Sequence, residues 1–168
     1  MPELLKERYF NKEFIEKLAV KIQEVYPEFD KRKFKTMVFD QAWQGKELKE
    51  KMRHVTHSLN QTLPANYKNA LAILKKVAPA FNDFDAMIFP DYVEVYGLDD
   101  WTISHEALAH FTRYSSSEFA IRPFIIKDSK SIMRKMREWA KDKNHHVRRF
   151  ASEGCRPRLP WAMALPEF

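Results

Sequence analysis

The stretch AIRPFIIKDSKSIMRKMREWAKDKNHHVRRF, residues 120–150, decides the fold class. Its two ends repeat one pattern at an offset of 26 residues, because IRPF at 121–124 matches VRRF at 147–150. In each copy a polar helix cap precedes a step made of an apolar residue, an arginine, any residue and a phenylalanine. Such a short repeat predicts helix pairs that stack, since each pair buries its apolar face against the next pair.

Helical periodicity extends this pattern over most of the chain. Helices are predicted at 46–62 and after the polar caps Asn11, Asp30, Asn66, Asp100, Ser116 or Ser117, Asp128 or Ser129, and Asn144. In the helix predicted over 118–127, Pro123 should cause a kink or a restart. The segment MIFPDYVEVY, 87–96, is either a short strand or a broken helix. We predict an all-α fold of stacked antiparallel helix pairs, a HEAT-like α-solenoid, with residues 1–168 as a single domain.

The composition excludes several other classes of protein. Only 3 of the 168 residues are glycine, which disfavours a turn-rich β-sandwich, and they stand too far apart for a P-loop or a Rossmann loop. The single cysteine, Cys155, excludes a disulfide framework and any multi-cysteine zinc site. The chain has no long apolar run and no signal-peptide pattern at its start. These features predict a soluble cytoplasmic protein.

The positive charge is concentrated in the C-terminal part of the chain. Residues 1–100 hold 16 basic and 16 acidic side chains, whereas residues 101–168 hold 13 basic and 7 acidic ones. Between His145 and Arg158 there are four arginines and no lysine. The planar guanidinium suits phosphate oxygens, so the pattern indicates either a polyanion-binding face or a solvated basic surface.

Helical spacing groups acidic and basic side chains in the two repeat copies. His145, Arg149, Glu153 and Arg156 fall on one face of the last helix, and Glu118 and Arg122 stand four residues apart on the earlier one. These are either ordinary surface ion pairs or a cationic groove that contains two carboxylates. The second reading has a chemical use, because carboxylates stabilise the positive charge that develops on a sugar when a glycosidic bond breaks.

Three other features carry weaker predictions. His105 and His110 are five residues apart, not four as in a zinc helix, and we predict no metal site. Trp161 lies beside the arginines and either stacks on a nucleoside or packs against the protein. The apolar segment from Leu159 to Phe168 either packs back onto the core or docks on a further repeat, which would make this chain the N-terminal part of a longer repeat domain.

Two sequence strings carry a family resemblance. SSEFAIRPFI, 116–125, and HHVRRFASEGCRPRLPW, 145–161, resemble the AlkC branch of the HEAT-like DNA alkylation repair glycosylases, which are relatives of AlkD. WTISHEALAHFT, 101–112, also suits that family. The resemblance implies a DNA repair enzyme, a hydrolase that excises cationic alkylated bases such as 3-methyladenine from double-stranded DNA and leaves an abasic site.

The resemblance also implies roles for particular residues. Glu118 and Glu153 would be the catalytic acidic residues near the deoxyribose of the lesion, and Arg156 and Trp161 would line the site. The DNA backbone contacts, or structural partners of the carboxylates, would be Arg122, Arg148, Arg149 and Arg158. The family also continues with further repeats that supply another catalytic aspartate.

No cofactor and no metal is expected, and the protein would be a monomer that is associated with the nucleoid when bound to DNA. The alternative is a non-catalytic HEAT-like module that binds nucleic acid or an acidic protein partner.

Overall fold

The computed structural model describes residues 2–165, and this part of the chain is built from helices without any β-strand. The all-α prediction is therefore confirmed. The chain divides into two compact units between Phe89 and Pro90, a point that falls within one helix. That residues 1–168 act as one domain stays a prediction.

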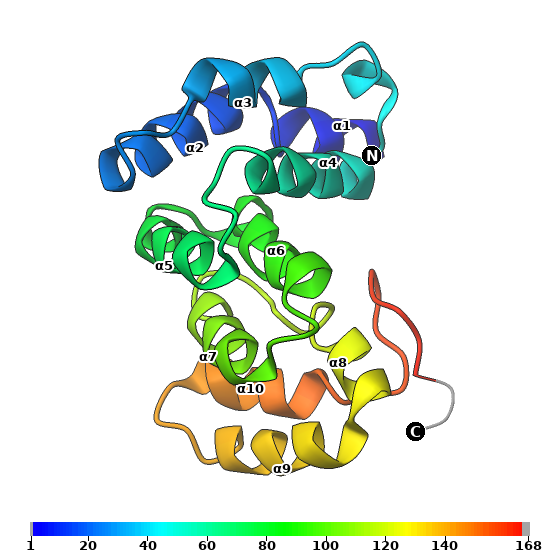
Figure 1. Cartoon of the computed structure of the whole chain (residues 1–168). Coiled ribbons are helices and arrows are strands. Elements are labelled where there is room, and N and C mark those ends of the chain that lie inside the picture. Colours follow the sequence, from blue (N-terminus) through cyan, green and yellow to red (C-terminus); the bar gives the residue numbers. More distant parts are fainter. Residues whose placement is uncertain (1, 166–168) are drawn as a thin grey trace. The chain divides into compact units, whose positions relative to one another are not determined.

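The first unit holds the helices α1 to α5 and three short 3-10 helices (Figure 1). The α-helices are α1 Pro2–Arg8, α2 Lys12–Val25, α3 Lys31–Val38, α4 Leu48–Asn60 and α5 Tyr67–Val77. The 3-10 helices are η1 Trp43–Gly45, η2 Ala78–Ala80 and η3 Asp83–Met87. Side chains of the predicted caps Asn11, Asp30 and Asn66 accept hydrogen bonds from the first turns of α2, α3 and α5. Helix α1 was not predicted from the sequence.

Apolar stripes hold the first unit together. Helix α2 packs against both α3 and α5, and α3 packs against α4, as the upper part of Figure 1 shows. The stripe of α2 buries Ile15, Leu18 and Ile22 completely, with residues recurring at the spacing of one helix face. Burial of this kind is the main stabilising force in a fold made of helix pairs.

The division between the units falls in α6, Ile88–Tyr96, where the sequence left a strand and a broken helix open. The structure shows a helix. Pro90 lies in its first turn, where the missing backbone N–H has no intrahelical partner to lose. The proline therefore marks a helix start here.

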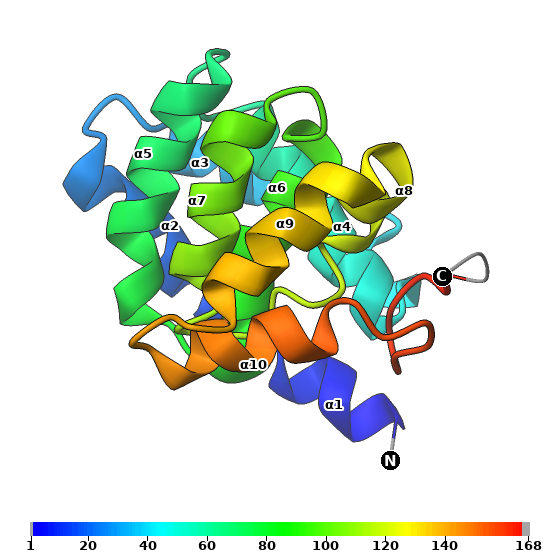
Figure 2. The same ribbon diagram turned by 90° about the horizontal axis from the view of Figure 1, so that it is seen from below.

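The second unit contains α7 Trp101–Phe111, α8 Arg122–Lys127, α9 Ser129–Trp139 and α10 His145–Glu153. Helix α9 packs against both α8 and α10, as Figure 2 shows from below. The aromatic rings of Trp139 and Phe150 join α9 to α10, with centroids 5.0 Å apart. The predicted caps Asp100, Asp128 and Asn144 are all confirmed by side-chain hydrogen bonds.

The helix predicted over 118–127 is shorter than expected. It begins only at Arg122, and residues 118–121 form a turn before it. Pro123 lies in the first turn of α8, so it marks the restart rather than a kink. In the described part of the chain, no helix combines the length and the apolar character needed to cross a bilayer.

Candidate functional site

Glu118 lies in the turn that precedes α8, and this turn is anchored from within. The buried Ser117 hydroxyl donates to the carbonyl of Leu108 at 3.0 Å, and the N–H of Glu118 donates to the Ser116 hydroxyl at 3.4 Å. Only 5% of the surface of Glu118 is exposed. The sequence therefore places a carboxylate against the core at a fixed point, instead of on a solvated helix face.

Glu153 is the last residue of α10, and the helix orients it. Val147 and Phe150 are fully buried on one side of α10, which leaves Arg149 and Glu153 together on the other side. The Nε of Arg149 donates to Oε2 of Glu153 at 3.2 Å. The shared face predicted from the spacing is confirmed for these two residues.

Arg149 also reaches the first glutamate. Its Nε lies 3.5 Å from Oε1 of Glu118, so one guanidinium stands between the carboxylates of Glu118 and Glu153. The side chain of Arg149 is 57% exposed, which leaves this bridge open to solvent on one side. Arg156 joins the group through its Nη2, which lies 3.9 Å from Oε1 of Glu153. We call Glu118, Arg149, Glu153 and Arg156 the carboxylate–arginine cluster.

Burial shapes the electrostatics of this cluster. The loss of water around Glu118 raises the pKa of its carboxyl above the usual range of a glutamate. Arg149 and the backbone N–H of Glu118 act in the opposite direction, and the negative charge of Glu153 adds to the rise. Glu118 is thus a carboxylate whose charge depends on its cationic neighbour.

The expected pair of Glu118 with Arg122 does not form. Because α8 begins only at Arg122, the two residues do not share a helix, and helical spacing does not bring their side chains together. The guanidinium of Arg122 is fully buried and donates to backbone carbonyls of Gly154, Arg156, Pro157 and Met163. All these donors are used inside the protein, so in this structure Arg122 offers no free group for the predicted contact with the DNA backbone.

The remaining predicted residues lie on the surface. Arg148 is exposed, and its Nη1 donates to the carbonyls of Asp142 and Lys143 at 2.8 and 2.9 Å, where it closes the loop between α9 and α10. Arg158 is exposed, and Trp161 is 47% exposed. A nucleic acid can therefore reach these three side chains, and their DNA contacts stay predictions. Phe168 lies outside the described residues.

Two structural roles were missed by sequence reasoning. Gly154 follows α10 so closely that an added Cβ would lie 2.8 Å from the carbonyl oxygen of Phe150 and 3.1 Å from Cε of Met136. The buried role of Arg122 was missed as well. Its position within the apolar run AIRPFII was the available signal, because a lone arginine among buried residues needs internal acceptors.

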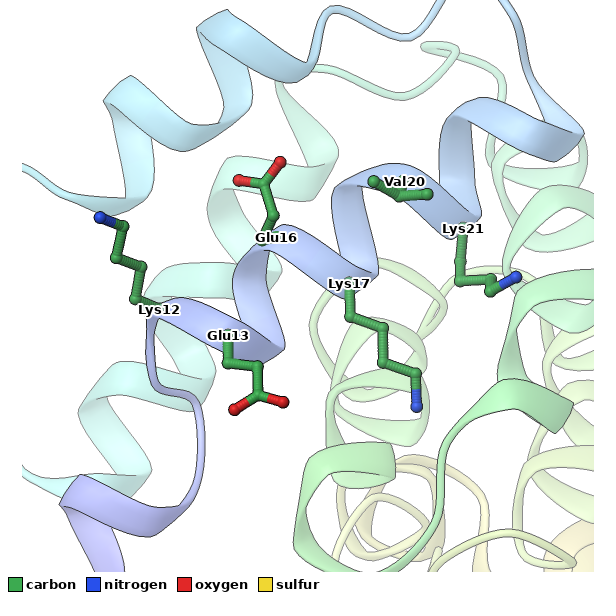
Figure 3. A pocket seen from close by; sticks show the side chains of 6 residues that line it. All are labelled: Lys12, Glu13, Glu16, Lys17, Val20 and Lys21. Atoms are coloured by element: carbon green, nitrogen blue, oxygen red, sulfur yellow. The ribbon is translucent and has the colours of Figure 1, made fainter.

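A separate shallow pocket lies on α2 in the first unit (Figure 3). Some of its charged groups already have local partners, since Glu16 accepts from Lys35 at 2.8 Å and Lys17 donates to the carbonyl of Ala80 at 2.8 Å. The pocket contains none of the residues of the carboxylate–arginine cluster. Within residues 2–165, no group of three or more His, Cys, Asp and Glu side chains is arranged to hold a metal ion.

Fold and site together define a class of protein, an all-α helical-repeat protein with two carboxylates on one arginine. Comparison makes the class more specific. The structure superposes on Pseudomonas fluorescens alkylpurine DNA glycosylase AlkC, solved bound to DNA containing an abasic site analog, with a TM-score of 0.91 and 40% identity. The match covers 97% of this chain and 45% of that one. The chain therefore has an AlkC-type fold, and the resemblance seen in the sequence is confirmed.

A second relative comes from sequence comparison. The chain is 48% identical over 162 residues to the uncharacterized protein YhaZ of Bacillus subtilis (strain 168), and the match covers 96% of this chain and 45% of that protein. The chain thus spans about half the length of the relatives that it matches. No family model matches the chain.

Proposed function

We propose that this chain supplies the lesion-facing part of a DNA N-glycosylase that excises cationic alkylated bases, such as 3-methyladenine, from duplex DNA and leaves an abasic site. The observation that carries the proposal is the pair of glutamates, Glu118 and Glu153, within hydrogen-bonding or ion-pair distance of Arg149. The AlkC-type fold supports the same function, because the neighbour with that fold is an alkylpurine DNA glycosylase.

The reaction explains why carboxylates stand among DNA-binding groups. A negative side chain close to phosphates weakens DNA binding, so it needs another purpose. Cleavage of the N-glycosidic bond builds positive charge on the deoxyribose, and a nearby carboxylate stabilises that charge most when it is poorly solvated. Glu118 is the poorly solvated member of the pair, and the more exposed Glu153 is suited to orient the attacking water.

A cationic base needs little further help to leave. The alkylated purine departs as a neutral molecule, so the reaction requires no strong general acid and, in this proposal, no metal or other cofactor. Arg149 holds the two carboxylates in place before DNA binds. When the sugar becomes cationic, it would replace Arg149 as the positive partner of the two carboxylates.

The basic residues around the cluster would hold the DNA. The proposal assigns phosphate contacts to the exposed residues Arg148, Arg149, Arg156 and Arg158, and stacking against the damaged nucleoside to Trp161. Arg122 is left out of the contacts because it is buried. We further propose that the protein acts as a monomer in the cytoplasm and joins the nucleoid when it binds DNA.

A base-release assay tests the function. The chain is incubated with methylated duplex DNA, and free 3-methyladenine is measured for the wild type and for Glu118→Gln and Glu153→Gln. Glu138→Gln is the matched control, because Glu138 is an exposed glutamate of α9 that pairs with Lys135. We expect each cluster variant to lose about 100-fold in release rate while it still binds DNA, and the control to retain full activity. The assay is repeated with any longer product of the same gene.

The alternative function, a non-catalytic module, gives a different result. A pure binder would release no base in any form, and it would keep or gain DNA affinity when the glutamates become glutamines, because a repulsive charge is removed. Unchanged release of 3-methyladenine after both substitutions would remove the catalytic assignment of the two glutamates.

A further inference from the structure

Arg122 is a buried side chain of the second unit that donates to four backbone carbonyls. Its Nη1 donates to the carbonyl of Gly154 at 3.2 Å, and its Nη2 donates to those of Arg156 and Pro157 at 2.7 and 2.9 Å. Its Nε donates to the carbonyl of Met163. The side chain has no exposed surface, so the start of α8 holds the segment after α10 through four backbone acceptors at once.

The segment held by Arg122 closes on itself. We call residues 154–165 the C-terminal loop. The N–H of Leu165 donates to the carbonyl of Pro157 at 2.8 Å, and Leu165 is fully buried. The loop is thus closed by the hydrogen bond between Leu165 and Pro157, and the guanidinium of Arg122 holds it from Gly154 to Met163. Figure 1 shows it as the orange and red chain beyond α10, returning past α8.

Trp161 lies between the tied points in an unusual backbone conformation. Its φ is 67°, in the left-handed region, which bulky residues rarely adopt. Such a conformation persists only where the surrounding structure imposes it. Carbonyls on both sides of Trp161, those of Pro157 and Met163, are fixed by Arg122. We call the four hydrogen bonds of Arg122 to backbone carbonyls the clamp. The clamp holds the backbone on both sides of the exposed indole of Trp161.

We propose that Arg122 is a positioning residue, which holds the C-terminal loop so that Trp161 is presented to the damaged nucleoside. This inference rests on the proposed function for the role of Trp161, but the clamp itself does not. An arginine is needed because a planar guanidinium offers five N–H donors in a fixed fork, whereas lysine offers three donors at one point. Arg122 acts through Trp161 and does not touch the DNA.

Fluorine NMR of the fluorotryptophan-labelled chain tests the clamp without any need for activity. The chain has four tryptophans, and Trp161→Phe identifies the resonance of Trp161. The variants are Arg122→Lys and Arg122→Met, and the matched control is Arg137→Met, which replaces an exposed arginine of α9. We expect both Arg122 variants to shift or broaden the Trp161 resonance, while Trp43 in the first unit keeps its position and the control changes nothing.

Each other result overturns the proposal. If the Trp161 resonance stays in place in a folded Arg122 variant, the clamp does not set the indole. If all four resonances change together, or if neither Arg122 variant folds, Arg122 serves the fold as a whole and has no specific role in positioning Trp161.

A base-release arm connects the clamp with the reaction. Where the wild type releases 3-methyladenine, Arg122→Lys should reduce the rate by up to about 100-fold, since small misplacements of positioning groups have effects of that size. Its affinity for undamaged duplex should stay unchanged. Combined with Trp161→Ala, the second substitution should add little further loss; fully additive losses would contradict action through Trp161. If neither this chain nor a longer product of the same gene releases base, the proposed function is refuted, and the NMR experiment still decides the clamp.

Discussion

The two repeat copies in the second unit share an arginine at the same position, but the surroundings of this arginine differ between the copies. In both IRPF, 121–124, and VRRF, 147–150, the apolar residue and the phenylalanine are buried, at 2% exposure or less. The arginines between them have opposite surroundings, because Arg122 is fully buried and Arg148 is exposed. Local periodicity sets which side of a helix faces the core. Whether a long polar side chain is buried or exposed depends on whether a segment distant in sequence covers it, as the C-terminal loop covers Arg122.

Replacing each arginine by methionine should give the largest contrast. Arg122→Met leaves four backbone carbonyls without their donor, one in a buried place and three in partly buried ones, so we expect the free energy of unfolding to fall by about 3–5 kcal/mol. Arg148→Met loses bonds to two carbonyls at the surface, where water replaces the donor, and should cost less than about 1 kcal/mol. Urea unfolding of both variants measures the difference. Equal losses would mean that burial does not separate the two copies.

The glycine after α10 provides the next contrast. Gly154→Ala forces a Cβ to within 2.8 Å of a backbone oxygen, and the carbonyl of Gly154 is also an acceptor of Arg122. We expect a loss of about 1–3 kcal/mol in the free energy of unfolding. Gly45→Ala is the matched control, because a Cβ there meets nothing within 4 Å and should be neutral or slightly stabilising. If Gly154→Ala were as well tolerated as the control, α10 and the C-terminal loop would not be closely packed.

The contrast explains how far sequence reasoning reaches. Caps and apolar spacing are local, so the helix starts at Asn11 and Asn144 and the pairing of Arg149 with Glu153 were predictable. The ion pair between Arg149 and Glu118 joins residues 31 positions apart, so helical spacing did not predict it, and only the family resemblance gave Arg149 as a partner of the carboxylates. The burial of Arg122 was not predicted, because the carbonyls that accept its hydrogen bonds come from a segment without regular structure. Periodicity carries no information about such a segment.

The buried glutamate predicts a smaller, pH-dependent effect. Burial raises the pKa of Glu118 in the folded state above its value in the unfolded chain. Between those two pKa values the folded state binds more protons, so the free energy of unfolding should fall as the pH rises through this window. Glu118→Gln lacks the titration, and the stability of the wild type relative to this variant should therefore decline with rising pH. Urea unfolding across the acidic range measures it.

Glu138→Gln is a control of opposite sign for this prediction. Lys135 lowers the pKa of the exposed Glu138, so its stabilising contribution is present above the unfolded pKa and is lost as the pH falls through the folded one. The stability of the wild type relative to Glu138→Gln should therefore rise weakly with pH. If the stability of the wild type relative to Glu118→Gln also rose with pH, that result would contradict a raised pKa for Glu118.

The smallest expected effect is on the salt dependence of DNA binding. If Arg148 and Arg149 contact phosphates, neutralising both should weaken binding to every duplex sequence and flatten the plot of log affinity against log salt, by about 0.9 for each lost contact. Arg122→Lys should leave that slope unchanged, because a buried side chain displaces no counterion from DNA. A flatter slope for Arg122→Lys would place that side chain at the DNA. An unchanged slope for the double variant would mean that neither arginine contacts a phosphate. Arg148 would then serve to hold its loop carbonyls, and Arg149 to hold its two glutamates.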